Sequence, residues 1–151
     1  MLCPPRPPTE RKAHKNAADD KTGRCNRNPA QTGSDNCPCS TNIGLDYEWF
    51  GVDAGQRAAA DRIQKFLIDD CRKDSYHIYE LDGRVIDEKA LHPFAITATT
   101  AQGSLAAQGE LAKEWVEIFW NMPLRTGDRR YYDNCLYIFA FLALSGNYRI
   151  W

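Results

Sequence analysis

The stretch "YYDNCLYIFAFLALSG", residues 131–146, decides how the chain is to be interpreted. It is apolar on nearly every side over 135–144, and it ends at Ser145-Gly146, a dipeptide typical of a helix C-terminus. We therefore expect a helix over 131–144 that must be covered on all sides. No run in the chain reaches the ~18–20 consecutive apolar residues that a membrane span needs.

The segments before this stretch also have helical patterns. "ELAKEWVEIFW" places Leu111, Trp115, Ile118 and Phe119 on one stripe, so we expect an amphipathic helix with Trp115 in the core. Two further helices are expected, one over 54–69 after an N-cap at Asp53 and one beginning at Pro93. Four or five helices do not supply enough cover for the apolar one. The chain is therefore expected to be part of a larger helical structure.

One short segment favours strands instead. Tyr76, Ile78 and Tyr79 form a run of β-formers, and Asp82-Gly83 follows before a second such run. A DG dipeptide between two β-type runs indicates a hairpin. We expect a small β-hairpin on an otherwise all-α scaffold, with His77 facing solvent.

Residues 1–40 differ from the rest of the chain. They contain no Phe, Tyr or Trp, they hold most of the prolines, and their basic residues outnumber the acidic ones. Such a segment cannot bury enough apolar surface to offset its chain entropy. We expect 1–40 to be disordered, as a segment translated from another reading frame or from a misplaced gene start, and 41–151 to be the folded part.

The cysteines do not predict a metal site. The first segment contains Cys3, Cys25, Cys37 and Cys39, which lack the C-x2-4-C spacing of a structural zinc site. No cofactor is expected. Cys71 and Cys135 lie in helical patterns and are expected to be small buried apolar residues. A net charge of -1 gives no indication of nucleic-acid binding.

Three stretches together resemble the C-terminal part of glycoside hydrolase family 8, in its branch of reducing-end xylose-releasing exo-oligoxylanases. They are "NIGLDYEWFG" (42–51), "ALHPFAITATTAQGSLAA" (90–107) and "FWNMPLRTGDRRYYDNCLYIFAFLALSGNYRIW" (119–151). The resemblance implies an (α/α)6 barrel in which inner and outer helices alternate. It also implies that the full enzyme is more than twice as long as this chain. The predicted fold class is thus all-α, a partial (α/α)6 barrel with one short β-hairpin.

The resemblance further implies inverting hydrolysis of β-1,4 glycosidic bonds by two carboxyl groups, an acid and a base. The family's general acid lies early in the chain, and no segment here corresponds to it. The base stands in a Tyr-Asp-Ala-x-Arg motif eleven residues before the aspartate that matches Asp46, which points to Asp35. The neighbours of Asp35 do not reproduce that motif, and the alternative is an aspartate in a loop.

Leu91-His92-Pro93 matches a Leu-His-Pro loop of the exo-acting branch. In that branch the loop narrows the reducing-end side of the cleft, and the resemblance makes Leu91, His92 and Pro93 candidate substrate-binding residues. A proline-stiffened turn can block the next subsite, and a histidine can hydrogen-bond sugar hydroxyls. The alternative is a turn that leads into a helix and carries a surface histidine.

Other polar and aromatic residues have two interpretations each. Trp49, Trp120 and Tyr131 could stack on sugars, although packing in the core is the simpler expectation. Asp46 and Glu48 could contact a substrate, although acidic residues are also favoured near helix starts. The charged cluster of the segment after Pro123 is expected to be a solvated loop: Arg125, Asp128, Arg129 and Arg130.

The sequence therefore predicts a fragment of a xylo-oligosaccharide hydrolase, cytoplasmic and incomplete as a catalyst. The alternatives are a non-catalytic helical module that binds sugars or a partner chain, and a helical scaffold without a sugar ligand. Exposed apolar faces are expected to cause self-association. Neither a nucleic acid nor a membrane is an expected partner.

Overall fold

The computed structural model describes residues 37–51, 53–72, 76–79 and 83–149. Within these residues the structure has five α-helices and one two-stranded sheet. In chain order the elements are α1 (Cys37–Phe50), α2 (Ala54–Arg72), β1 (His77–Tyr79), β2 (Val85–Lys89), α3 (Pro93–Gln102), the 3₁₀ turn η2 (Gly103–Leu105), α4 (Glu110–Asn121) and α5 (Arg130–Leu144). The prediction of an all-helical fold with one short hairpin is confirmed.

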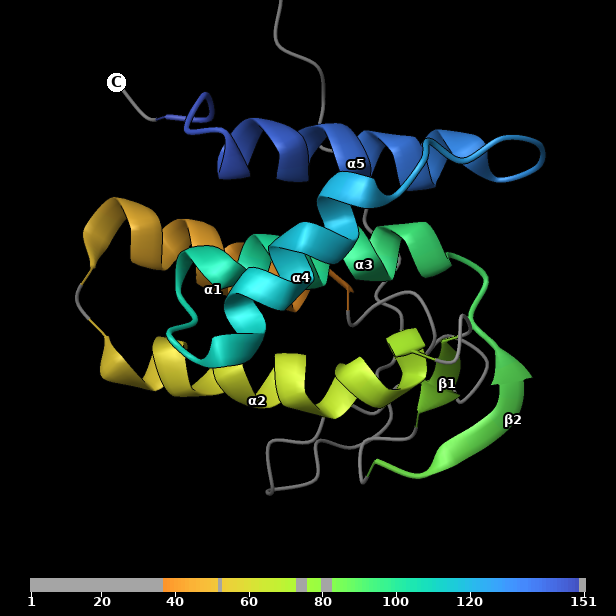
Figure 1. Ribbon diagram of the computed structural model, residues 1–151, viewed down its shortest axis with the longest axis horizontal. Helices are drawn as coiled ribbons and strands as arrows, with labels where there is room; N and C mark the ends of the chain where they lie inside the picture. Colours follow the sequence, from red (N-terminus) through yellow and green to blue (C-terminus); the bar gives the residue numbers. More distant parts are fainter. Residues whose placement is uncertain (1–36, 52, 73–75, 80–82, 150–151) are drawn as a thin grey trace, which may run out of the picture.

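The helices alternate in direction (Figure 1). α1, α3 and α5 run one way, and α2 and α4 run the other way. α3 lies in the middle and contacts both α1 and α5, while α2 and α4 contact each other. The hairpin lies at the end of the molecule where α3 and α5 begin, so this end carries both the hairpin and the start of two parallel helices.

Small residues let α1 and α3 pack closely. A Cβ added at Gly44 would overlap the backbone carbonyl oxygen of Gln102, and one added at Gly103 would overlap the hydroxyl of Ser40. α3 is correspondingly rich in Ala and Thr, and residues 95–102 are all buried. The backbones approach because no larger side chain separates them.

The core lies between α2, α3, α4 and α5. Trp115 and Phe119 of α4 are fully buried, as the apolar stripe predicts, and the indole of Trp115 donates a hydrogen bond to the Gln64 carbonyl at 3.2 Å. Cys71 and Cys135 were expected to be buried, but both are partly exposed. Within the described ranges, no group of His, Cys, Asp or Glu could hold a metal ion.

The hairpin pairs β1 and β2 in antiparallel register, with Ile78 opposite Ile86 and Tyr79 opposite Val85. Gly83 has φ +86, the backbone region that the predicted turn requires. His77 was expected to face solvent, but its ring lies 3.1 Å from the Asp70 carboxylate and is 27% exposed. Asp70 also accepts the backbone N–H of His77, which ties the hairpin to α2.

α1 extends into the segment that was expected to be disordered. α1 begins at Cys37, so 37–40 are helical, with Pro38 in the first turn where its missing N–H costs nothing. The remainder of the segment predicted to be disordered, 1–36, lies outside the described residues, as do Asp35, Cys3 and Cys25.

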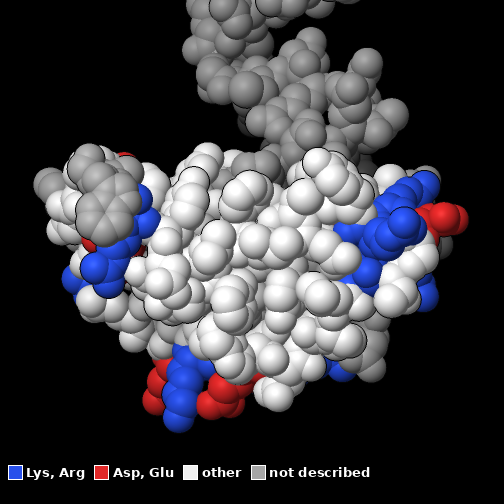
Figure 2. All heavy atoms as spheres, turned by 90° about the horizontal axis from the view of Figure 1, so that it is seen from above, with Lys and Arg blue, Asp and Glu red and all other residues white. Residues whose placement is uncertain are grey.

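α5 lies on α3 and leaves its other face uncovered. Ile138, Phe139 and Phe141 are 53%, 48% and 42% exposed, although the sequence pattern predicts a helix that needs cover on all sides. The face seen in Figure 2 is largely uncharged at its centre, with Lys, Arg, Asp and Glu gathered at its edges. None of the described helices is long and apolar enough to cross a bilayer.

Candidate functional site

The Leu-His-Pro turn joins β2 to α3. Pro93 is the first residue of α3, a position that suits its fixed φ and missing N–H. Leu91 is 50% exposed and projects from the turn, whereas His92 is largely covered. The turn therefore presents one bulky apolar side chain at the end of the molecule where α3 and α5 begin (Figure 1).

A fully buried carboxylate lies beneath this turn. Asp133, in the first turn of α5, has no exposed side-chain surface, and its Oδ1 accepts the backbone N–H of Ala95 at 3.0 Å. That N–H belongs to the first turn of α3, where backbone donors have no partner within the helix and negative charge is favoured. Asp133 thus joins the start of α5 to the start of α3.

Arg125 completes the attachment of the turn. Its Nη1 donates to the Leu91 carbonyl at 3.0 Å and also to Asp133 Oδ2. The expectation that Arg125 belongs to a solvated loop is therefore wrong: its side chain is only 19% exposed. Asp128, Arg129 and Arg130 are exposed, as expected for that cluster.

Asn134 holds the backbone of Arg125 in place. Its Oδ1 accepts the Arg125 N–H at 3.0 Å, and its Nδ2 donates to the Arg125 carbonyl at 3.0 Å. The segment continues through Gly127 and Arg129, which have φ +76 and +62. The guanidinium therefore reaches Leu91 from a backbone that is itself fixed.

His92 is held on two sides. Its Nδ1 lies 3.4 Å from Asp133 Oδ1, and its ring lies 4.6 Å from the ring of Tyr132 at an interplanar angle of 58°. The side chain is 17% exposed. Three residues from two segments thus meet at the turn: Arg125 of the loop before α5, and Tyr132 and Asp133 of α5.

Sequence reasoning found the turn but missed its support. Asp133 stands in the first turn of an apolar helix, and an acidic residue at that place is the one signal that could have indicated it. The pairing of Asp133 with Arg125 cannot be predicted from helical periodicity, because Arg125 lies in a loop. It becomes visible only when the chain is folded.

The other carboxylates considered lie away from this turn. Asp46 and Glu48 are in the second half of α1 rather than near a helix start, and both are exposed. The Asp46 carboxylate accepts a hydrogen bond from Gln56 Nε2. The carboxylate of Asp133 lies beside the turn, and it already bonds Arg125.

The aromatic candidates also lie apart from one another. Trp120 is 52% exposed and stacks on Phe141, with ring centroids 5.4 Å apart and an interplanar angle of 19°. Tyr131 is 82% exposed. Trp49 lies beside Tyr148, with centroids 5.8 Å apart, so it packs against a ring of its own chain.

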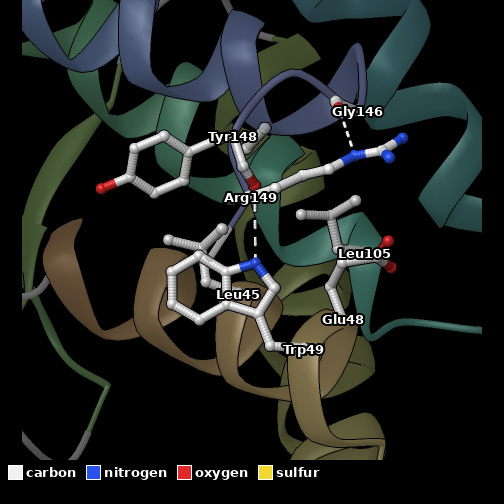
Figure 3. Close-up of a pocket in the computed structure, with 8 residues that line it drawn as sticks. Leu45, Glu48, Trp49, Leu105, Gly146, Tyr148 and Arg149 are labelled. Atoms are coloured by element: carbon white, nitrogen blue, oxygen red, sulfur yellow. Dashed lines mark hydrogen bonds between the residues drawn. The ribbon is translucent and has the colours of Figure 1, made fainter. Parts of the chain in front are cut away.

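A pocket of about 300 Å³ lies at the opposite end of the molecule, between the C-terminal ends of α1 and α5 (Figure 3). Trp49 and Tyr148 stand together on one side, and Glu48 and Arg149 lie on the other. The indole N–H of Trp49 donates to the Tyr148 carbonyl at 3.4 Å, and Arg149 Nε donates to the Gly146 carbonyl at 2.8 Å. These polar contacts are made within the chain.

Three curated proteins are similar to this chain, and all three are named reducing-end xylose-releasing exo-oligoxylanases. The protein of Halalkalibacterium halodurans is 52% identical over 119 residues, which is 78% of this chain and 30% of that protein. The protein of Paenibacillus barcinonensis is 50% identical over 118 residues, which is 78% of this chain and 31% of that protein. The protein of Bifidobacterium adolescentis is 46% identical over 126 residues, which is 77% of this chain and 32% of that protein.

Solved structures agree with the sequence relatives. A crystal structure of a reducing-end xylose-releasing exo-oligoxylanase matches with a TM-score of 0.71 at 55% identity, covering 74% of this chain and 29% of that one. The Paenibacillus barcinonensis structure in complex with xylose matches with a TM-score of 0.70 at 51% identity, covering 74% and 29%. In a further structure of that protein, with a TM-score of 0.70 at 49% identity, a consecutive leucine and histidine are replaced by alanine and serine.

The expected fold class, a part of an (α/α)6 barrel, is confirmed by these structures. No family model matches the chain. The chain spans about 30% of the length of the curated relatives it matches.

Proposed function

We propose that this chain is a segment of an inverting glycoside hydrolase of family 8 that cleaves β-1,4 bonds of xylo-oligosaccharides at the reducing end. About half of the aligned residues are identical to those of proteins named for that activity, and the helices superpose on their structures. One relative has been solved with xylose and, as a variant, with an arabinofuranosyl-xylotetraose. The substrate class of this chain would be the same.

The observation that supports the proposal most is the rigid Leu91-His92-Pro93 turn. Leu91 projects into solvent while its carbonyl is bonded to Arg125, so the turn cannot swing aside without breaking that contact. A fixed apolar projection at a cleft would leave room for one sugar and exclude a longer chain. The chain contains one Leu-His pair, and such a pair is the one replaced in the solved variant of its relative.

The segment would be incomplete as a catalyst. Inverting hydrolysis needs two carboxyl groups on opposite faces of the sugar, roughly 6.5–9.5 Å apart. The general acid has no counterpart in the sequence, and the candidate base Asp35 lies outside the described residues. Leu91, His92 and Pro93 would therefore shape the substrate site, and the missing carboxyl would come from the other part of the barrel.

An exchange experiment tests this function. The 119 matching residues of the Halalkalibacterium halodurans relative are replaced by the corresponding residues of this chain. We expect the exchanged enzyme to release xylose from xylotriose. Leu91→Ala and His92→Ser together should lower the share of xylose among the first products from xylohexaose, because the barrier is removed. Leu124→Ala, which shortens another exposed leucine, should leave that share unchanged.

The alternative function is a non-catalytic helical module that binds a sugar or a partner chain. The pocket beside Trp49 and Tyr148 favours it, since aromatic rings next to charged groups are typical of sugar sites (Figure 3). The exchange experiment separates the two functions. An exchanged enzyme that folds and binds xylotriose without releasing xylose would support the module and contradict the hydrolase segment.

A further inference from the structure

Asp133 bonds Arg125 and the Ala95 N–H and lies beside His92, yet sequence reasoning gave it no role. We propose that Asp133 is a positioning residue for His92: it keeps a proton on Nδ1 and so leaves Nε2 as the hydrogen-bond acceptor that faces a sugar hydroxyl. The identity of the ligand rests on the function proposed above. The state of the histidine ring rests on the geometry alone.

The two carboxylate oxygens of Asp133 have different partners. Oδ2 accepts from Arg125, which in turn bonds Leu91, while Oδ1 accepts from the backbone of Ala95 and lies 3.4 Å from His92 Nδ1. The guanidinium of Arg125 and the N-terminus of α3 both complement a negative charge on the carboxylate. His92 therefore stands beside a buried negative charge.

That charge selects the tautomer of His92. Nδ1 is buried, and no hydrogen bond of good geometry satisfies it. An unprotonated Nδ1 would direct its lone pair at a carboxylate oxygen, which is repulsive and is costly in a poorly solvated site. A protonated Nδ1 instead directs a positive hydrogen at Oδ1, and a small adjustment of the ring completes the bond. In the neutral ring the other nitrogen, Nε2, is then the acceptor.

The packing around the ring leaves the edge opposite Nδ1, which carries Nε2, as the one open to a ligand. Tyr132 lies against the ring, and Nδ1 is buried toward Asp133, so the 17% of the side chain that is exposed belongs to the remaining edge. A neutral acceptor at that edge pairs with a donor, which for a sugar is a hydroxyl group. The arrangement resembles a carboxylate that holds a catalytic or metal-binding histidine in one tautomer through its second nitrogen.

Solid-state NMR of the full chain with ¹⁵N-labelled histidine reads this state directly. The chain has three histidines, and the His92 signals are assigned by their loss in His92→Gln. In the neutral ring, we expect Nδ1 to be protonated and Nε2 to be bare. The opposite tautomer in the unaltered chain, with bare Nδ1 and protonated Nε2, would overturn the proposal. Because the measurement does not depend on particle size, self-association does not prevent it.

A matched pair of variants tests whether Asp133 is the cause. In Asp133→Ala no carboxylate faces Nδ1, so we expect Nδ1 no longer to carry the proton in all neutral His92 rings. Asp128→Ala removes a charge from the exposed preceding loop and should leave the tautomer unchanged. If Asp133→Ala folds and every neutral His92 ring keeps a protonated Nδ1, the positioning role is wrong. If it does not fold, the spectrum of the unaltered chain decides.

Xylotriose separates this inference from the proposed function. Binding of the sugar should shift the Nε2 resonance of His92 while Nδ1 stays protonated. A protonated Nδ1 with no response to saturating xylotriose would support the positioning role and count against the sugar site in this chain. Loss of the Nδ1 proton on binding would overturn the positioning role, because the ligand would then have changed the tautomer that Asp133 sets.

Discussion

At the scale of single residues, Asp133 is expected to contribute most to stability at the Leu-His-Pro turn. Asp133→Ala leaves the guanidinium of Arg125 largely buried without its carboxylate and removes the acceptor of the Ala95 N–H. Loss of one partner of a buried ion pair costs about 3–5 kcal/mol. We expect a decrease of about 3 kcal/mol in the free energy of unfolding, measured with urea. Asp128→Ala, on the exposed loop, should change it by less than about 0.5 kcal/mol.

Tyr76 gives a prediction for alkaline pH. Burial is the main cause that raises the pKa of its hydroxyl far above the ordinary value of 10.0, and the hydroxyl lies 2.9 Å from Thr97 Oγ1. A raised pKa in the folded state means that stability is full below pH 10 and falls as the pH rises further, because only the unfolded chain releases the proton readily. Urea midpoints should therefore decrease above pH 10. In Tyr76→Phe this part of the decrease should disappear, and an unchanged alkaline slope would contradict the assignment.

At the scale of elements, the spacing of apolar residues predicts the bounds of a helix and the side chains that it buries. The apolar stripe of α4 indicates both its bounds and the burial of Trp115, and the Asp-Gly dipeptide indicates the hairpin. The same reasoning does not indicate that 37–40 are helical, because they contain no aromatic residue and Ser40 lies close to Gly103 of η2, far away in the sequence. Arg125 was misjudged for a related reason, since its partner Asp133 lies on another element.

The close contact of α1 and α3 is the element-scale feature most open to test. Gly44→Ala improves helix propensity by about 1 kcal/mol, but its methyl group would meet the backbone of Gln102 and force the helices apart. Overpacking of this kind costs about 1–3 kcal/mol, so we expect a net loss of stability in thermal or urea unfolding. Gly55→Ala in α2 meets only the side chain of Asp53 and should not destabilise the chain. Equal effects of the two changes would contradict the packing described.

At the scale of the whole molecule, the uncovered face of α5 should govern behaviour in solution. Ile138, Phe139 and Phe141 of α5 are 53%, 48% and 42% exposed, and the face seen in Figure 2 has few charges at its centre. Large exposed apolar patches mark interfaces or cause aggregation. We expect the purified chain to form species larger than one chain in size-exclusion chromatography with light scattering.

A pair of lysine substitutions tests which face causes the self-association. Ile138→Lys should shift the chain toward the monomer, because a charge on α5 must be desolvated when two copies meet. Val85→Lys, at an equally exposed position on the hairpin, should not. A monomeric unaltered chain with a cooperative thermal transition would contradict the expectation, since it would show that the α5 face is tolerated in water.

The central claim is that this chain is a hydrolase segment without a complete catalytic pair, and xylose release from xylotriose tests it most directly. The purified chain and the exchanged enzyme that contains it are incubated with xylotriose, and free xylose is measured by chromatography. We predict none above the uncatalysed background for the chain alone and turnover for the exchanged enzyme. Xylose release by the chain alone would contradict the claim.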